Sequence, residues 1–318
     1  QVLVQVCFFS LQHHSISSRM QRAAVVQIAP GEDLKENLKK AGALIDEAAE
    51  ARATLIGLPE TFTIEYRKDF FASVAEAVVP GASDLKPESV ATGSELLATK
   101  ARQHGVTIFG GVVERDAEKL FNSVAVYGPD GSLLAVYRKL HLSCVRAGTD
   151  KTSEADVFAP GEKLVHFEMP DSTAGDSVWH ARVGLGICFD LRFDIHRNYA
   201  RSVGCDILAY PSAFLESTGK DHWEVLLRAR AIDEQVFVIA PNHAKTDVQQ
   251  TKMFGHAMIC APWGHILAST GKSEGDCVVV ADLPAIQVSD IRSRIPLRVV
   301  RRQFEGVDEV KNGKRQRC

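Results

Sequence analysis

Residues 182–193 read RVGLGICFDLRF, an apolar run that passes directly into a reactive side chain. Its apolar residues alternate with two glycines, as expected for a buried strand against which a neighbouring element packs closely. Cys188 closes the strand expected over 182–188, and a helix is expected over 191–203. In layered α/β folds, ligands bind in the crevice at the ends of strands. The stretch therefore predicts an α/β protein whose crevice contains Cys188.

Strands and helices alternate along the rest of the chain. The apolar patterns predict strands at 23–28, 54–58, 106–113, 206–210 and 236–240, and helices at 34–48, 94–104 and 221–235. Two hairpins are expected at 122–137 and 257–269, because turn-forming proline and glycine residues separate their strands. Helices mixed with strands and hairpins indicate an α/β sandwich with mixed sheets rather than a purely parallel sheet.

The composition excludes several classes of partner. With 45% hydrophobic and 24% charged residues, the 318-residue chain can bury a substantial core. Its formal net charge is −3, and no basic face precedes the end of the chain, so no nucleic acid is expected as a partner. The longest apolar runs have the length of strands, well short of the roughly 20 residues of a membrane helix. No membrane partner is therefore expected.

The cysteines and histidines show no arrangement typical of a metal site. The seven cysteines include no CxxC pair, and the histidines have no ligand spacing, so neither a metal nor an organic cofactor is expected. An odd number of scattered thiols suits a reducing compartment. We expect a cytoplasmic location, and the unusual residues 1–20 leave a mitochondrial fraction open as an alternative.

The chain is expected to contain one folded domain. Residues 1–20 are interpreted as an N-terminal extension, either a targeting segment or disordered. Residues 21–300 contain no linker, repeat or low-complexity stretch and are predicted to form the domain. Residues 301–318 are basic toward their end and are predicted to form a C-terminal tail.

Three reactive side chains share one position, at the end of an expected buried strand. Glu60 follows LIGLP, Lys139 follows LAVYR and Cys188 follows VGLGI. A thiolate can attack an amide carbonyl and divide hydrolysis into acylation and deacylation. A helix N-terminus and a nearby lysine would both lower the pKa of the thiol. Taken singly, each residue also has an ordinary structural interpretation: a helix-terminal acid, a solvated lysine and a core cysteine.

In this interpretation the three residues divide the chemistry of amide hydrolysis among them. Cys188 is the nucleophile, and Glu60 is the general base that takes the thiol proton and later activates water. Lys139 and the backbone N–H of Phe189 stabilise the oxyanion of the tetrahedral intermediate.

Three segments, GLPETF at 57–62, YRKLHL at 137–142 and GLGICFDLRF at 184–193, resemble the signature segments of the nitrilase-like carbon–nitrogen hydrolases in sequence, order and spacing. The resemblance covers about residues 22–300. It implies a four-layer αββα sandwich with two mixed β-sheets. It also implies a catalytic triad of Glu60, Lys139 and Cys188.

The same resemblance implies further features of the site and of the assembly. A second active-site glutamate follows the lysine in this family, and Glu154 fits its place. The loop at 143–150 departs from the usual pattern, since it begins SCVR. Members of the family usually form homodimers or larger homo-oligomers.

The segments at 210–214 and 222–231 are similar to the eukaryotic amidase branch of the family. That branch contains omega-amidases, which act on 2-oxoglutaramate and 2-oxosuccinamate, and deaminated-glutathione amidases. Residues 110–140 are more similar to the omega-amidases, whereas residues 210–263 are at least as similar to the deaminated-glutathione amidases. Both activities therefore remain open. The partners expected are a small amide substrate that carries a carboxylate, and water.

Four residues are candidates for contacting such a substrate. Arg192 could bind a carboxylate, or could instead pair with Asp190 or Glu60. The other three candidates are Phe189, Tyr66 and Phe214. Nitrile hydrolysis, acyl transfer by the same triad and a non-catalytic scaffold are the alternative functions, although a scaffold would not need all three triad residues.

Overall fold

The computed structural model describes residues 20–81, 90–147, 150–170, 179–245, 251–271 and 273–300. The extension and the tail predicted at 1–20 and 301–318 lie outside these residues, apart from Met20, which begins the first strand.

The first sheet has seven strands in the order β12-β1-β2-β3-β4-β5, with β15 paired to β1. Its strands are β1 (Met20–Ile28), β2 (Leu55–Gly57), β3 (Thr107–Asp116), β4 (Lys119–Tyr127), β5 (Leu133–Arg138), β12 (Asn242–His243) and β15 (Cys277–Pro284). Strands β12, β1, β2 and β3 are parallel neighbours, whereas β4, β5 and β15 pair in the antiparallel sense. The sheet is therefore mixed, as predicted.

The second sheet has six strands in the order β14-β13-β11-β10-β9-β8. Its strands are β8 (His166–Glu168), β9 (Arg182–Leu185), β10 (Ile207–Ala209), β11 (Phe237–Ala240), β13 (Met258–Cys260) and β14 (Ile266–Ser269). Strands β9, β10 and β11 are parallel, and antiparallel strands flank them. A Cβ added at Gly186 would lie 2.6 Å from the Tyr210 ring. The close packing predicted for the glycines of residues 182–188 is therefore confirmed.

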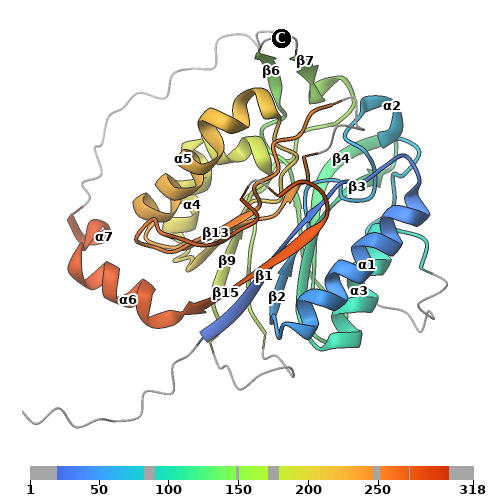
Figure 1. The fold of residues 1–318 in the computed structure, drawn as a ribbon. Helices are drawn as coiled ribbons and strands as arrows, with labels where there is room; N and C mark the ends of the chain where they lie inside the picture. The colour runs from blue at the N-terminus through green and yellow to red at the C-terminus, as the bar shows by residue number, and fades with distance from the viewer. Residues whose placement is uncertain are drawn as a thin grey trace, which may run out of the picture.

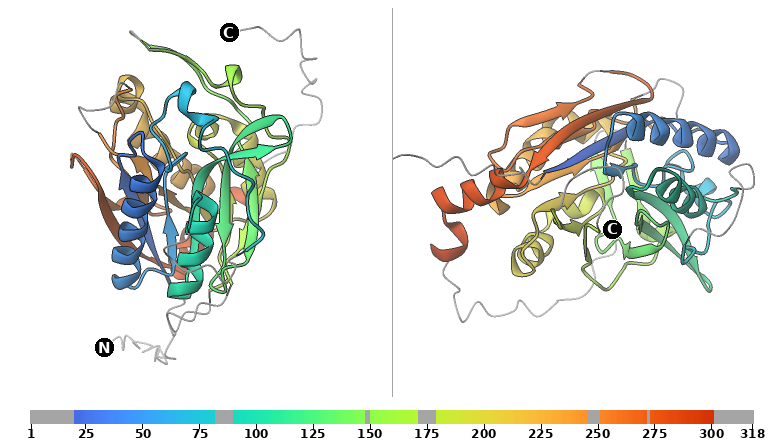
Figure 2. Two further views of the ribbon diagram at one scale, coloured as in Figure 1. Left: turned by 90° about the vertical axis from the view of Figure 1, so that its right-hand side faces the viewer. Right: turned by 90° about the horizontal axis from the view of Figure 1, so that it is seen from below.

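Helices cover the outer face of each sheet (Figures 1 and 2). The helices are α1 (Leu34–Glu50), α2 (Lys68–Phe71), α3 (Gly93–His104), α4 (Asp194–Ser202), α5 (Glu216–Glu234), α6 (Ala285–Arg294) and α7 (Leu297–Val300). Helices α1 and α3 lie on the first sheet, and α4 and α5 lie on the second, so the predicted four-layer αββα sandwich is confirmed. Among the residues described, no helix combines the length and the apolar character that crossing a membrane requires.

Local sequence explains how these helices begin and which face they bury. In α1, Leu38, Ala41, Ile45 and Ala48 form the buried stripe that their spacing predicts. The Asp33 side chain accepts the Glu36 N–H at the start of α1, which is one half of a capping box. Helix α3 has a complete capping box, formed by Thr92 and Glu95, which the sequence interpretation did not identify.

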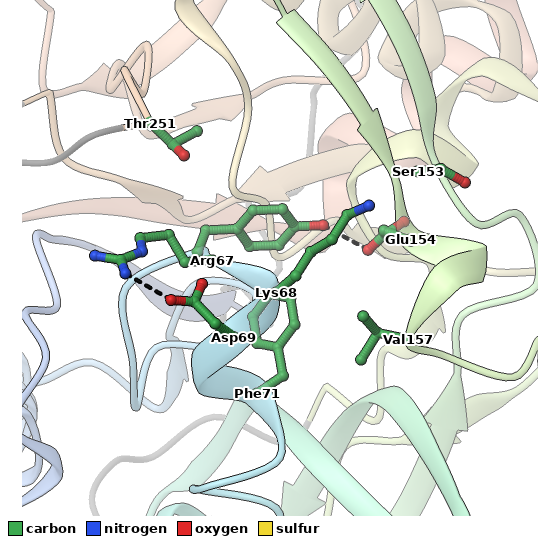
Figure 3. Close-up of a pocket in the computed structure, with 9 residues that line it drawn as sticks. Arg67, Lys68, Asp69, Phe71, Ser153, Glu154, Val157 and Thr251 are labelled. Carbon is green, nitrogen blue, oxygen red and sulfur yellow. Dashed lines mark hydrogen bonds and ion pairs between the residues drawn. The ribbon is translucent and has the colours of Figure 1, made fainter.

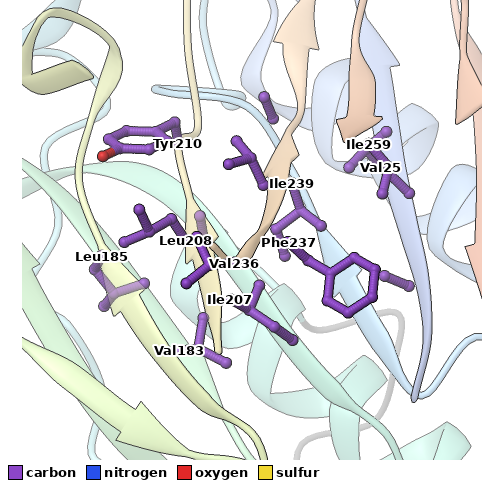
Figure 4. Close-up of a cluster of buried hydrophobic side chains, with 14 of the residues drawn as sticks. Val25, Val183, Leu185, Ile207, Leu208, Tyr210, Val236, Phe237, Ile239 and Ile259 are labelled. Atoms are coloured by element: carbon purple, nitrogen blue, oxygen red, sulfur yellow. The ribbon is translucent and has the colours of Figure 1, made fainter. Parts of the chain in front are cut away.

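The core lies between the two sheets (Figure 4). Val25 from the first sheet packs in one cluster with Val183, Ile207, Phe237 and Ile239 from the second, and all five are fully buried. Burial of such side chains contributes about 1.5–3 kcal/mol each. This core holds the strand ends of the two sheets side by side.

The structure corrects two expectations near the reactive residues. The helix predicted over 191–203 is divided into a 3₁₀ helix, η3 (Cys188–Arg192), and α4, because Phe193 between them has extended dihedrals of −106° and 141°. The loop at 143–150 contains strand β6 (Cys144–Ala147), which pairs with β7 (Asp150–Ser153) and was not predicted.

Candidate active site

Glu60 lies three residues beyond strand β2 and is fully buried. The backbone on either side of it pairs with β3: Gly111 donates to the Pro59 carbonyl at 2.9 Å, and Phe62 donates to the Gly111 carbonyl at 3.1 Å. A Cβ at Gly111 would lie 2.5 Å from the Glu60 Cα. Glycine at 111 is therefore required for the backbone of the glutamate to reach this position.

Glu60 is one of three buried ionisable groups in direct contact. The Lys139 Nζ lies 2.7 Å from Glu60 Oε1 and 2.8 Å from Glu154 Oε2, and the lysine is only 1% exposed. The Asn122 amide donates to Glu60 Oε1 at 2.6 Å and to Glu154 Oε1 at 2.9 Å. The Ala213 N–H donates to Glu60 Oε2 at 2.7 Å. Both glutamates predicted for the site thus lie beside the predicted lysine.

The charges of this cluster follow from its burial and its contacts. Burial alone would lower the pKa of Lys139, but Glu154 and Glu60 outweigh it and raise the lysine pKa, so the ammonium persists. Burial would raise the pKa of Glu154, yet Lys139 holds it below the usual value. For Glu60, burial dominates and raises the pKa. Lys139 and Glu154 therefore form the ion pair, and Glu60 is the carboxylate with the greater affinity for a proton.

Cys188 opens η3 with a φ of 43°, in the left-handed region, and its N–H donates to the Pro211 carbonyl at 3.0 Å. Burial, together with Glu60, raises the pKa of its thiol well above the usual value, and Lys139 opposes this only in part. The expected lowering of the pKa by a helix dipole is therefore wrong, because Cys188 starts a short 3₁₀ turn rather than an α-helix. A protonated thiol needs a base, and Glu60 is the basic group of the cluster.

A small cavity of about 30 Å³ opens beside Cys188. It is lined by Tyr66, Ser143, Cys188, Phe189, Arg192, Ala213, Phe214, Leu215 and Thr218, so all four predicted substrate-contacting residues border it. Arg192 forms none of the ion pairs considered for it with Asp190 or Glu60. Its Nη1 lies 3.3 Å from His222 Nδ1, and its Nε has no hydrogen-bond partner among the described residues.

A second cavity, of about 330 Å³, is lined by residues of α2 and of the segment 153–157 (Figure 3). Tyr66 and Glu154 both line it, and the tyrosine hydroxyl donates to Glu154 Oε1 at 2.5 Å. Tyr66 lines both cavities. Trp223 is fully buried and donates to the His256 carbonyl, so it has a packing role in the core.

Several residues that shape the site were not identified from the sequence. Asn122 lies within strand β4, where a polar residue gives no signal of its own, and only pairing with the neighbouring strands places it between the two glutamates. The fully buried His243 follows an apolar strand and has its Nε2 2.6 Å from the Glu60 carbonyl oxygen.

Burial lowers the pKa of His243 to about 4, which makes the free energy of unfolding dependent on pH. The folded protein binds this proton less tightly than the unfolded chain, whose histidine pKa is about 6.5. The stabilising contribution of neutral His243 is therefore complete above pH 6.5 and is lost as the pH falls toward 4. We expect the stability advantage of the wild type over His243→Gln to shrink by about 2 kcal/mol between pH 7.5 and 5. Urea unfolding at both pH values measures this difference, and an advantage that stays constant would contradict the prediction.

One group of side chains has the composition of a metal site. The ligand atoms of His141, Asp190 and His196 all lie within 4.8 Å of one another. However, His141 Nδ1 and His196 Nε2 lie 2.7 and 3.2 Å from Asp190 Oδ1, which are ordinary hydrogen-bond distances. Hydrogen bonding accounts for this cluster.

A buried carboxylate, a buried ammonium and a thiol that meet at the strand ends of an αββα sandwich define the class of thiol-dependent hydrolases built on this fold. Within that class, residues 22–293 match the carbon–nitrogen hydrolase family, and the chain belongs to it. It is a hydrolase that acts on carbon–nitrogen bonds other than peptide bonds.

Related proteins agree with this assignment. The chain is 37% identical to omega-amidase NIT2 of Xenopus tropicalis, over 92% of this chain and 99% of that protein. It is 36% identical to omega-amidase NIT2 of Homo sapiens, over 87% of this chain and 93% of that protein. The structure is similar to Saccharomyces cerevisiae Nit3, a member of branch 10 of the nitrilase superfamily, with a TM-score of 0.73 and 27% identity over 88% of this chain and 95% of Nit3.

Proposed function

We propose that the protein is an omega-amidase, which hydrolyses the terminal amide of 2-oxoglutaramate or 2-oxosuccinamate and releases ammonia. The observation that carries this proposal is the buried cluster of Glu60, Lys139 and Glu154 beside a cavity that contains both Cys188 and Arg192. The cluster supplies the chemistry of amide hydrolysis, and Arg192 supplies a cation for the substrate carboxylate. The names of the curated relatives support the same substrate class.

In acylation, the Cys188 sulfur attacks the amide carbonyl carbon while Glu60 takes the thiol proton. The carbonyl oxygen becomes an oxyanion, which the Lys139 ammonium and the Phe189 N–H stabilise. When the C–N bond breaks, Glu60 returns its proton to the nitrogen, and ammonia leaves a thioester on Cys188. Glu154 holds the lysine in its charged form throughout, because the two are paired at 2.8 Å.

In deacylation, Glu60 takes a proton from water, and the resulting hydroxide attacks the thioester carbonyl. The same oxyanion contacts apply, and the carbon–sulfur bond then breaks. The thiolate regains a proton from Glu60, which restores the resting enzyme. One amide and one water thus yield one carboxylic acid and one ammonia.

The direct test is turnover of purified protein with 2-oxoglutaramate, 2-oxosuccinamate and deaminated glutathione, followed as ammonia release. We expect the two small 2-oxo amides to give the higher kcat/KM. Preference for deaminated glutathione would assign the protein to the other amidase of this branch. Hydrolysis of none of the three would reject the proposed substrates.

The carboxylate contact predicts the behaviour of Arg192→Met. A hydrogen-bonded contact with a charged group contributes about 1.5–3 kcal/mol, so kcat/KM for 2-oxoglutaramate should fall by about 10- to 150-fold, mainly through KM. The matched control is Arg197→Met, which removes an arginine of α4 that pairs with Asp194 and Asp233 and does not line the cavity. Steady-state kinetics with 2-oxoglutaramate and with an uncharged amide measure the effect. An equal loss on both amides would show that Arg192 does not recognise the carboxylate.

We also propose that the chain forms a homodimer through the surface of α4 and α5. The observation in favour is a set of exposed apolar side chains on and beside these helices, namely Ile195, Val225, Ile232 and Trp263. Val225 is 66% exposed, and grouped apolar side chains on a protein surface mark sites of interaction. Sedimentation equilibrium tests this assembly, and a monomer at micromolar concentration would reject it.

A further inference from the structure

The Asp190 carboxylate is fully buried and accepts hydrogen bonds from two separate segments of the chain. Its Oδ2 accepts from the Tyr137 hydroxyl at 2.6 Å and from the Ile187 N–H at 3.0 Å. Its Oδ1 accepts from the His141 N–H at 3.0 Å and contacts His141 Nδ1 at 2.7 Å. Burial alone would raise the pKa of Asp190, but hydrogen bonds from His141 and His196 outweigh it and hold the pKa well below its usual range. Asp190 is therefore an anion that receives donors on both oxygens.

The donors of Asp190 flank two of the reactive residues. Tyr137 and His141 lie two positions before and two positions after Lys139, and Ile187 immediately precedes Cys188. Lys139 follows β5 of the first sheet, whereas Cys188 follows β9 of the second. One carboxylate thus joins the lysine segment of one sheet to the cysteine turn of the other.

We propose that Asp190 is a positioning residue, which sets the placement of Cys188 relative to Lys139 by binding the chain on both sides of the lysine and just before the cysteine. This inference rests on the proposed roles of Lys139 and Cys188. Glu60, Asn122, Lys139 and Glu154 contact one another directly, through residues of the first sheet and of the segments that follow its strands. Cys188 has to be brought to them across the space between the sheets.

Asparagine is the informative replacement because it keeps the shape of Asp190 and removes the charge. In the wild type, each of the two carboxylate oxygens faces a pair of hydrogen-bond donors. An asparagine would replace one of these oxygens by an NH₂ group, which cannot accept from the pair of donors that it faces. Those hydrogen bonds would be lost, and one of the two segments would shift. A misplacement of about 1 Å in an active site can lower the rate about 100-fold.

We expect Asp190→Asn to lower kcat for 2-oxoglutaramate about 100-fold while KM changes less than threefold. Tyr137→Phe, which removes a single hydroxyl, should lower kcat by a smaller factor. In the Asp190→Asn background, Tyr137→Phe should have a smaller effect than in the wild type, because both changes weaken the same link between the lysine segment and the cysteine turn. Additive effects of the two substitutions, or a kcat of Asp190→Asn within threefold of the wild type, would overturn the proposal.

Glu76→Gln is the matched control for a merely structural role. Glu76 is also buried and accepts two backbone N–H groups, from Gly93 and Ser94 at the start of α3, but it does not line the Cys188 cavity. The control should lower the melting temperature without lowering kcat. Should Asp190→Asn not fold, Tyr137→Phe decides alone: a folded Tyr137→Phe protein with unchanged kcat would overturn the proposal.

A second readout separates this inference from the proposed substrate. The rate of Cys188 alkylation by iodoacetamide as a function of pH reports the apparent pKa of the thiol without any substrate. A lysine displaced from Cys188 stabilises the thiolate less, so Asp190→Asn should shift this profile to higher pH. If the wild type hydrolyses none of the 2-oxo amides, the proposed function is rejected. The alkylation profile still tests the role of Asp190 in that case: a shift in Asp190→Asn would support the positioning role, and an unchanged profile would overturn it.

Discussion

Replacement of Cys188 by alanine should lower amide turnover at least ~10⁴-fold, because the variant lacks the thiol that forms the acyl intermediate. Cys188 is the only cysteine among the described residues that lines the cavity next to this cluster. Ammonia release under single-turnover conditions measures the loss. Mass spectrometry should find a substrate-derived thioester on the wild type after rapid acid quench and none on the variant.

Cys205→Ala is the matched control for Cys188→Ala. Cys205 is also buried in the core, where burial raises the pKa of its thiol to about 12, and it lies behind β9 against Gly184. We expect this control to lose stability through lost packing but to retain its turnover. Full turnover by Cys188→Ala, or equal losses in the two variants, would refute the nucleophile assignment.

The positions of the reactive residues could be predicted because each depends on a local pattern. Glu60, Lys139 and Cys188 each follow a short apolar run, and the ends of such strands meet in a layered α/β fold. Glu154 could be placed only through the resemblance, because the hairpin that carries it, β6 with β7, departs from the usual pattern. The sandwich itself follows from the alternation of strands, helices and hairpins.

The electrostatic state of the site could not be predicted in the same way. The pKa of Cys188 is raised rather than lowered, because burial and Glu60 act more strongly than Lys139, and local sequence reports neither. The roles of Asn122 and Asp190 could not be predicted either, because the residues that they contact are distant in sequence. Asn122 reaches Glu60 across 62 positions, and Asp190 reaches Tyr137 across 53. Only the register of the strands and the contact between sheets create such sites.

Lys139→Met should have the second largest effect, on activity and on stability together. Removal of an oxyanion donor costs about 3–4 kcal/mol of transition-state stabilisation, which corresponds to a fall in kcat of several hundred-fold. The same change leaves Glu60 and Glu154 buried without their cation, and breaking a buried pair in this way costs about 3–5 kcal/mol of stability. Kinetics on the folded fraction and urea unfolding at pH 7.5 measure the two losses separately.

The loss of stability in Lys139→Met should depend on pH in a definite direction. Without the ammonium, we expect the pKa of Glu154 in the folded state to rise above that of the unfolded chain, because Lys139 is the largest of the groups that oppose burial and only the hydrogen bonds from Ser143 and Tyr66 then do so. The folded variant then binds a proton more tightly than the unfolded variant, so the deficit is largest at neutral pH and shrinks as the pH falls through the raised pKa.

A double variant separates the two roles of the lysine. Lys139→Met with Glu154→Gln removes the unpaired charge together with the lysine, so it should recover much of the stability lost in the single variant. It should not recover turnover, because the oxyanion still lacks its cation. Lys100→Met, which breaks the partly exposed pair with Asp46, is the control and should retain full activity. If the double variant regained turnover along with stability, Lys139 would act only by balancing the charge of Glu154, and the oxyanion would have to be stabilised by backbone N–H groups alone.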